Sequence, residues 1–164
     1  MINYKELDKF IKDNYYTEPS YEGDFFIGGP IHYKAASCSC EEYAEEDIVI
    51  ELDESFSATI LKLIDEKGLK DSDVYNSINM DRRLFSKMRN SKYAPSKQTA
   101  LSLCIALKLD LEQSSELLKK AGYALSHSNM ADVIVEYFIR NRIYDIYKID
   151  EALLHYDQKP LSRY

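Results

Sequence analysis

Six basic side chains gather within residues 81–97 of this chain of 164 residues. The stretch holds one acid, Asp81, and has a formal charge of +5, whereas the whole chain has −7. Cations concentrated in this way more often belong to a solvated surface, but such a patch can also bind a polyanion such as DNA. Residues 81–97, the basic stretch, therefore supply the candidate binding residues. Its cations are Arg82, Arg83, Lys87, Arg89, Lys92 and Lys97.

An acidic block precedes the basic stretch. Residues 41–54 contain eight Asp or Glu residues, and no Lys or Arg occurs from Ala35 to Leu61. Such blocks usually mark a solvated linker or tail. Their carboxylates can also compete with DNA phosphate, because both segments are tethered in one chain. Two alternatives to DNA therefore stay open for the basic stretch: an acidic protein partner, or the chain's own acidic block.

Metal and disulfide chemistry have less support in the cysteine pattern. His32, Cys38 and Cys40 lie close together, but a structural zinc site needs four ligands in two short-spaced pairs, and the second pair is missing. An odd number of cysteines gives no disulfide framework. Cys104 lies among apolar residues at helical spacing, which predicts a small core side chain. We expect no bound metal.

Catalytic spacing is also missing. The three histidines, His32, His127 and His155, are far apart, and none lies beside a Ser, Cys or acid in a recognisable catalytic arrangement. Residues 28–30, Gly-Gly-Pro, lack the spacing and the following Lys of a phosphate-binding loop, so a turn is favoured. His127 is expected to cap a helix locally. We expect neither enzymatic activity nor a cofactor.

The helices that position the basic stretch can be predicted from the sequence. Five helical patterns follow one another from Ser55 onward. Apolar residues at intervals of four, seven and eight after Phe56 predict a first helix that ends at Gly68. Pro95 and Ser96 start a predicted fourth helix, and a fifth follows Asp110 and runs to Gly122. Side chains predicted to be buried in the fourth and fifth helices are Ala100, Leu101, Cys104, Leu107, Leu111, Leu117 and Leu118.

The second and third predicted helices surround a tight turn. The second runs from about Ser72, with Asp71 or Ser72 as its N-cap. Asn79 tolerates the left-handed backbone that the turn needs, and Asp81 caps the third helix. In that third helix, Leu84, Phe85 and Met88 are expected to face inward, and Arg82, Arg83, Ser86, Lys87 and Arg89 outward.

The run from Leu69 to Pro95, followed by Thr99-Ala100-Leu101 and by residues 106–111, resembles the Cro/C1-type helix-turn-helix domain of phage repressors and xenobiotic-response-element regulators. The resemblance covers Ser55 to Leu118, and its more specific elements are Phe85-Ser86, Pro95, Leu107 and Leu111. It implies that the third helix enters the major groove of DNA. On the matching positions, this assigns Arg82, Arg83, Ser86 and Lys87 to bases and nearby phosphates.

Three residues depart from the pattern of that family. Asp71 stands where a Gln usually touches a phosphate, and an acid at this position repels DNA. Tyr75 replaces a small residue that lets the second and third helices approach closely, and Asn79 replaces a common Gly. We expect the fold to survive with an altered crossing of the two helices.

The C-terminal part is similar to a helical module found at the C-terminus of some bacterial macro-domain and other signalling proteins. The resemblance extends over residues 122–128, 133–139 and 149–154. Two further helices are predicted there. They carry more apolar side chains than are needed to pack one face of a helix against the core. They are expected to cover the core or to form a homodimer interface, and the two roles can coexist.

The chain is therefore predicted to be all-α: a Cro/C1-like domain of five helices with two extra C-terminal helices, spanning residues 51–164. Residues 1–50 are predicted to be a Tyr-rich, acidic and partly ordered appendage, with an amphipathic helix around Leu7, Phe10 and Ile11 but no evident core.

No apolar run approaches the roughly 18 residues of a membrane span, and no secretion signal begins the chain, which predicts a cytoplasmic protein without a membrane partner. The functional hypothesis is a regulator that binds double-stranded DNA sequence-specifically. The alternative is a repurposed helix-turn-helix module for protein interaction in bacterial signalling or phage defence.

Overall fold

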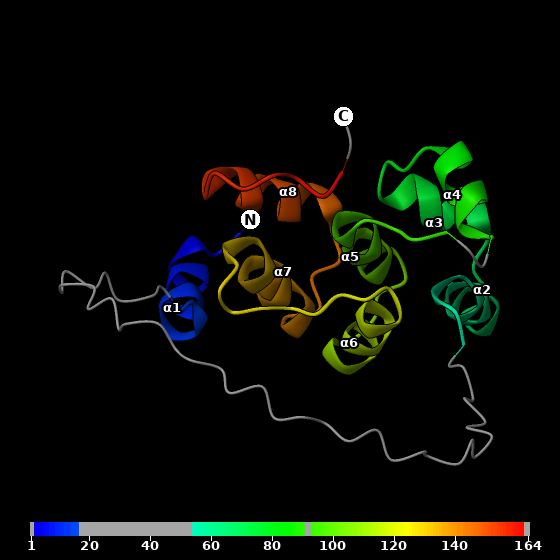
Figure 1. The fold of residues 1–164 in the computed structure, drawn as a ribbon. Coiled ribbons are helices and arrows are strands. Elements are labelled where there is room, and N and C mark those ends of the chain that lie inside the picture. Colours follow the sequence, from blue (N-terminus) through cyan, green and yellow to red (C-terminus); the bar gives the residue numbers. More distant parts are fainter. Residues whose placement is uncertain (1, 17–53, 91–92, 163–164) are drawn as a thin grey trace, which may run out of the picture. The chain divides into compact units, whose positions relative to one another are not determined.

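The computed structural model describes residues 2–16, 54–90 and 93–162, and all regular structure in these ranges is α-helical (Figure 1). The all-α prediction is confirmed for this part of the chain. No helix in it is long and apolar enough to cross a membrane. The helices are α1 (Tyr4–Asn14), α2 (Phe56–Glu66), α3 (Asp71–Ser77), α4 (Arg82–Met88), α5 (Lys97–Ala106), α6 (Leu111–Lys120), α7 (Met130–Arg140) and α8 (Ile146–His155).

Local capping explains where the helices begin and end. Ser96 accepts a hydrogen bond from the Thr99 amide at the start of α5, and Asp110 forms a capping box with Gln113 at the start of α6. Gly68 follows α2 with a φ of 61°, a left-handed conformation that glycine adopts without strain. These predicted boundaries are confirmed.

Helices α5 and α7 form the centre of the hydrophobic core. Every residue from Thr99 to Ile105 is buried, and so is every residue from Asp132 to Ile139. Helix α5 packs against α3 and α6, and α7 packs against α1, α6 and α8. Most of the apolar side chains in the C-terminal helices are thus core residues. On α8 the exceptions are Tyr147 and Leu154, which are 61% and 57% exposed.

Helix α1 belongs to the same packed unit as residues 54–162. The predicted amphipathic helix is confirmed, but the expectation that residues 1–50 contain no core was wrong for α1. Leu7 is completely buried in the contact with α7. The Tyr156 hydroxyl donates to Asp8 at 2.5 Å, and burial together with this hydrogen bond raises the pKa of Tyr156. The proposed boundary at residue 50 lies outside the described residues.

Buried carboxylates tie the C-terminal elements together. Glu136 accepts hydrogen bonds from Arg140, and the His127 ring nitrogen lies 2.9 Å from it. The local capping role expected for His127 was wrong, because Asn129 supplies the N-cap of α7. Asp150 accepts from the Leu161 amide at 2.6 Å and from Ser162. These bonds compensate the cost of burying the charges and fix the C-terminal tail.

Cys104 is completely buried, as predicted, and burial raises the pKa of its thiol to about 12. The raised pKa suppresses the reactive thiolate at every pH well below 12. In a variant with Cys38 and Cys40 changed to Ser, we expect no reaction with dithionitrobenzoate at pH 8 until urea unfolds the chain. The absorbance of the released thiolate gives the measurement, and rapid reaction of the native chain would contradict the assignment.

Candidate nucleic-acid interface

Helices α3 and α4 contact each other across a tight turn. Asn79 in this turn has a φ of 51°, so the predicted left-handed backbone is confirmed. Val74 and Phe85 are buried between the two helices and the core. Tyr75 is half-buried, and its ring centroid lies 5.8 Å from that of Phe85. The large side chain at position 75 is therefore accommodated by packing its ring on α4.

One side of α4 carries exposed polar side chains. Asp81 caps the helix by accepting a hydrogen bond from the Arg83 amide, as predicted. Residues separated by four positions lie on the same side of a helix. Arg82 and Ser86 therefore lie in one row along α4, and Arg83 and Lys87 lie in the adjacent row. All four are exposed, and none of the three cations makes an ion pair or side-chain hydrogen bond with another described residue. We name these four residues the α4 face.

Arg89 is exposed but its charge is already paired. Its guanidinium forms an ion pair with Asp71 at the start of α3. The predicted capping role of Asp71 or Ser72 was wrong, since Lys70 is the N-cap of α3 and no side chain caps that helix. The acid that would repel DNA is thus held beside a cation, and Arg89 stands at the edge of the α4 face.

Lys97 lies apart from the α4 face. Its ammonium bonds the carboxylate of Asp132, and the Lys97 and Asp132 side chains are only 28% and 3% exposed. Lys97 therefore balances a buried charge on α7. Lys92 lies outside the described residues. Of the seven predicted site residues, the structure brings Arg82, Arg83, Ser86 and Lys87 together, with Arg89 next to them.

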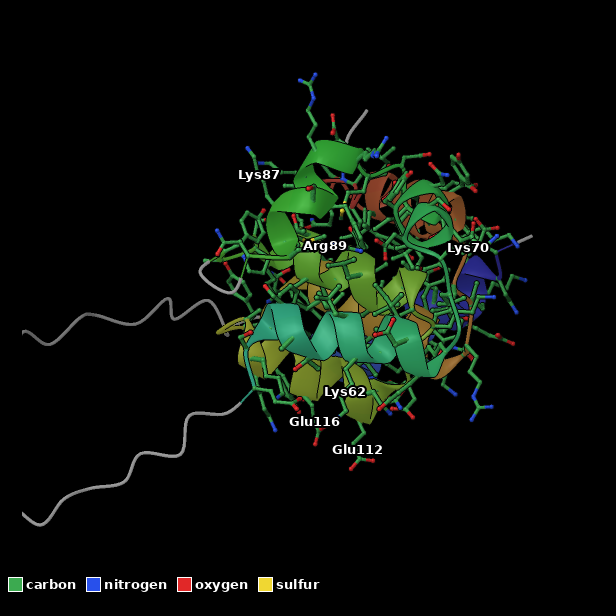
Figure 2. The ribbon with its side chains drawn as sticks, turned by 90° about the vertical axis from the view of Figure 1, so that its right-hand side faces the viewer. Lys62, Lys70, Lys87, Arg89, Glu112 and Glu116 are labelled. Carbon is green, nitrogen blue, oxygen red and sulfur yellow. The ribbon has the colours of Figure 1, made fainter. Side chains whose placement is uncertain are left out.

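Lys70 is a nearby cation that the basic stretch did not include. It lines a groove of about 600 Å³ between α3 and α4, together with Arg82 and Arg89. The sequence could have indicated Lys70 as a site residue, because it stands directly before the helix that contacts α4. Figure 2 shows Glu112 and Glu116 on α6, well away from Lys87 on α4. The exposed acids of α6 and the exposed cations of α4 are therefore segregated.

The described residues contain no group of three or more His, Cys, Asp or Glu side chains that could hold a metal ion. His32, Cys38 and Cys40 lie outside this part of the chain. No family model, curated protein or solved structure matches the sequence. The exposed side chains of the α4 face are therefore the features of this chain that point to a function.

Proposed function

We propose that this protein binds double-stranded DNA sequence-specifically, with α4 in the major groove, and acts as a regulator. The observation that carries the proposal is the α4 face: three exposed, unpaired cations and a hydroxyl among the described residues of the second helix in a helix-turn-helix pair. The major groove, about 12 Å wide, admits one α-helix. Arg can donate two hydrogen bonds to guanine, and Lys87 and Ser86 can reach bases or phosphates.

The acidic net charge does not exclude this function, because binding depends on the charge that meets the phosphates. Each phosphate neutralised by a cation releases counterions and contributes about 0.9 to the salt exponent. The α4 face offers three such cations, and Lys70 lies on the neighbouring groove. The exposed acids of α6 lie elsewhere on the molecule (Figure 2).

Selection from random duplex DNA with the purified full chain tests the proposal. We expect enrichment of one sequence motif, and no enrichment by the matched variant Arg82→Glu/Arg83→Glu/Lys87→Glu. The new carboxylates lie on an exposed helix face, two of them in the first turn, where negative charge favours the helix. A selection that retains no duplex, or retains all sequences equally, contradicts sequence-specific binding.

One observation favours the alternative of a protein-interaction module. Asp71 pairs with Arg89 beside the α4 face, so an acidic group already satisfies one cation of this region. An acidic protein surface would present carboxylates in the same way. Under this alternative, the DNA selection yields no motif.

Replacing Asp71 by Asn is expected to release Arg89 for phosphate binding. Affinity for random duplex should rise about threefold to tenfold at low salt, with a salt exponent steeper by about 0.9. Filter binding at two salt concentrations gives both quantities. Asp73→Asn is the matched control, since it removes the same charge from α3 without an ion pair to Arg89. Equal gains in the two variants would contradict release of Arg89.

We also propose that the chain forms a two-fold homodimer through its C-terminal helices. The sequence predicts that the dimer interface lies within the C-terminal helices, residues 128–156. Because α7 is buried, the exposed Tyr147 and Leu154 of α8 are the apolar side chains that can form this interface. Two helix-turn-helix units spaced by one turn of DNA give useful affinity. We expect a dimer in sedimentation at tens of micromolar and a monomer for Leu154→Glu. A monomeric wild-type chain, with and without DNA, would contradict this prediction.

A further inference from the structure

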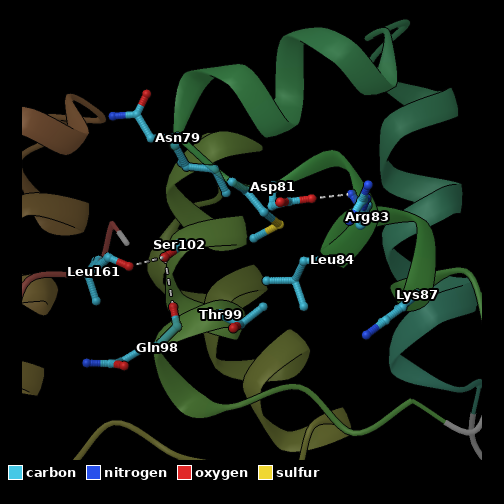
Figure 3. Close-up of a pocket in the computed structure, with 11 residues that line it drawn as sticks. Asn79, Asp81, Arg83, Leu84, Lys87, Gln98, Thr99, Ser102 and Leu161 are labelled. Carbon is cyan, nitrogen blue, oxygen red and sulfur yellow. Dashed lines mark hydrogen bonds between the residues drawn. The ribbon is translucent and has the colours of Figure 1, made fainter. Parts of the chain in front are cut away.

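A groove separates α4 from α5 on the side of α4 that carries Arg83 and Lys87 (Figure 3). It encloses about 540 Å³, which lies within the roughly 300–1,000 Å³ of small-molecule sites. The turn between α3 and α4 and the tail residue Leu161 complete its lining. We propose that this α4–α5 groove binds an amphipathic organic anion, with one carboxylate or phosphate group on an apolar body.

Apolar side chains form much of the lining. Ile78 and Leu161 are buried, whereas Met80 and Leu84 are only half-buried. Leu84 was predicted to face the core with Phe85 and Met88, but its side chain extends from α4 into the space beside α5 (Figure 3). Apolar surface that is left accessible to water favours an apolar ligand.

Two cations stand on one wall of the groove. Arg83 and Lys87 are four residues apart on α4, so their charged groups project from the same side of the helix. Neither has an ion pair within the part of the chain that the structure describes. Guanidinium and ammonium groups bind carboxylates and phosphates through charge-assisted hydrogen bonds. A bound anion would therefore sit at this wall, with its apolar body against Leu84 and Leu161.

The other polar groups are compatible with a negative ligand. Asp81 is the one acid among the described residues that line the groove, and its carboxylate is occupied as the N-cap of α4. The Ser102 hydroxyl donates to the Gln98 carbonyl oxygen at 2.8 Å. The Gln98 side-chain amide is neutral and points away from Arg83 and Lys87 (Figure 3), so it does not oppose an anion at that wall.

Occupation of the groove has a regulatory consequence, which rests on the proposed function. Arg83 and Lys87 belong to both the α4 face and the groove. An anion that holds these side chains withdraws them from DNA, so the ligand and DNA compete. Binding to the groove itself does not require that the protein binds DNA.

The test is a titration of the ¹⁵N-labelled full chain with naphthalene-1-acetate, followed by amide chemical shifts. We expect saturable shifts confined to residues 78–87, 98–102 and the tail near Leu161. The neutral naphthalene-1-acetamide and inorganic phosphate should each bind at least about fivefold more weakly, since each lacks one half of the recognised chemistry. No saturation below about 10 mM, or equal binding of the amide or of phosphate, overturns the proposal.

Single Lys→Gln substitutions test where the carboxylate of the ligand binds. Lys87→Gln should weaken naphthalene-1-acetate about fivefold and leave the acetamide unchanged. Lys70→Gln, an equal charge change outside the groove, should alter neither ligand. Unchanged acetate affinity in Lys87→Gln, with the spectrum of a folded chain, contradicts the site. If acetate binds but fails to displace random duplex, competition at a shared DNA face is contradicted while the groove stands.

Discussion

Charge reversal at Arg82 or Arg83 is expected to weaken binding to a selected duplex by about 5- to 150-fold, equivalent to about 1–3 kcal/mol of base discrimination. Both residues stand at the start of α4, where side chains of a recognition helix reach base edges. Binding to random duplex should fall less, because only the sequence-independent attraction to phosphate is lost there. Parallel titrations of the two duplexes at one salt concentration measure the difference.

The variants are expected to keep the fold. Arg82 and Arg83 are the first two residues of α4 and are exposed, and Glu is favourable in the first turn of a helix. Lys5→Glu is the matched control, because it makes the same charge change at an exposed position in the first turn of another helix, α1. Equal losses on selected and random duplexes would remove base recognition from the proposal. If Lys5→Glu weakened binding as much as the α4 variants, the effect would be due to net charge.

Local features of the fold could be predicted because neighbouring residues determine them. The caps Asp81, Ser96 and Asp110 bond amides two or three residues away, and Asn79 adopts its left-handed backbone within the turn itself. The helical spacing of apolar residues predicted the buried side of α2 for the same reason. The exposed positions of α4 could be predicted because the cap Asp81 fixes where the helix begins and the helical period then gives the side on which each residue lies.

The partners of individual charges could not be predicted, because they depend on packing between distant elements. Lys97 and Asp132 are separated by 35 residues, and Asp71 and Arg89 by 18. Both pairs change the candidate site: one takes Lys97 away from it, and the other occupies Arg89. Leu84 has the spacing of a core residue, but the position of α5 leaves it beside a groove. Charge counts alone therefore overstated the number of free cations.

The contribution of α1 was also missed, and it affects how the acidic block must be tested. Apolar periodicity identified the helix, but only the contact with α7 shows that it completes the core. Deleting residues 1–50 would remove the acidic side chains at 41–50 together with α1. Any change in DNA binding would then combine lost charge with lost packing. Changing the Asp and Glu residues within 41–50 to Asn and Gln separates the two effects, because it removes the charge and keeps α1 and the length of the connecting chain.

Leu7→Ala is expected to lower the free energy of unfolding by about 2–5 kcal/mol, because truncating a fully buried Leu loses apolar contact and leaves a cavity. Such a loss is a large share of the stability of a domain this small. Urea denaturation followed by circular dichroism measures it. The matched control is Lys9→Ala, an exposed position on the same helix, which should change stability by less than about 0.5 kcal/mol. Equal small effects of both variants would mean that α1 does not contribute to the core. A large effect of Leu7→Ala alone would show that α1 contributes to the core in its contact with α7.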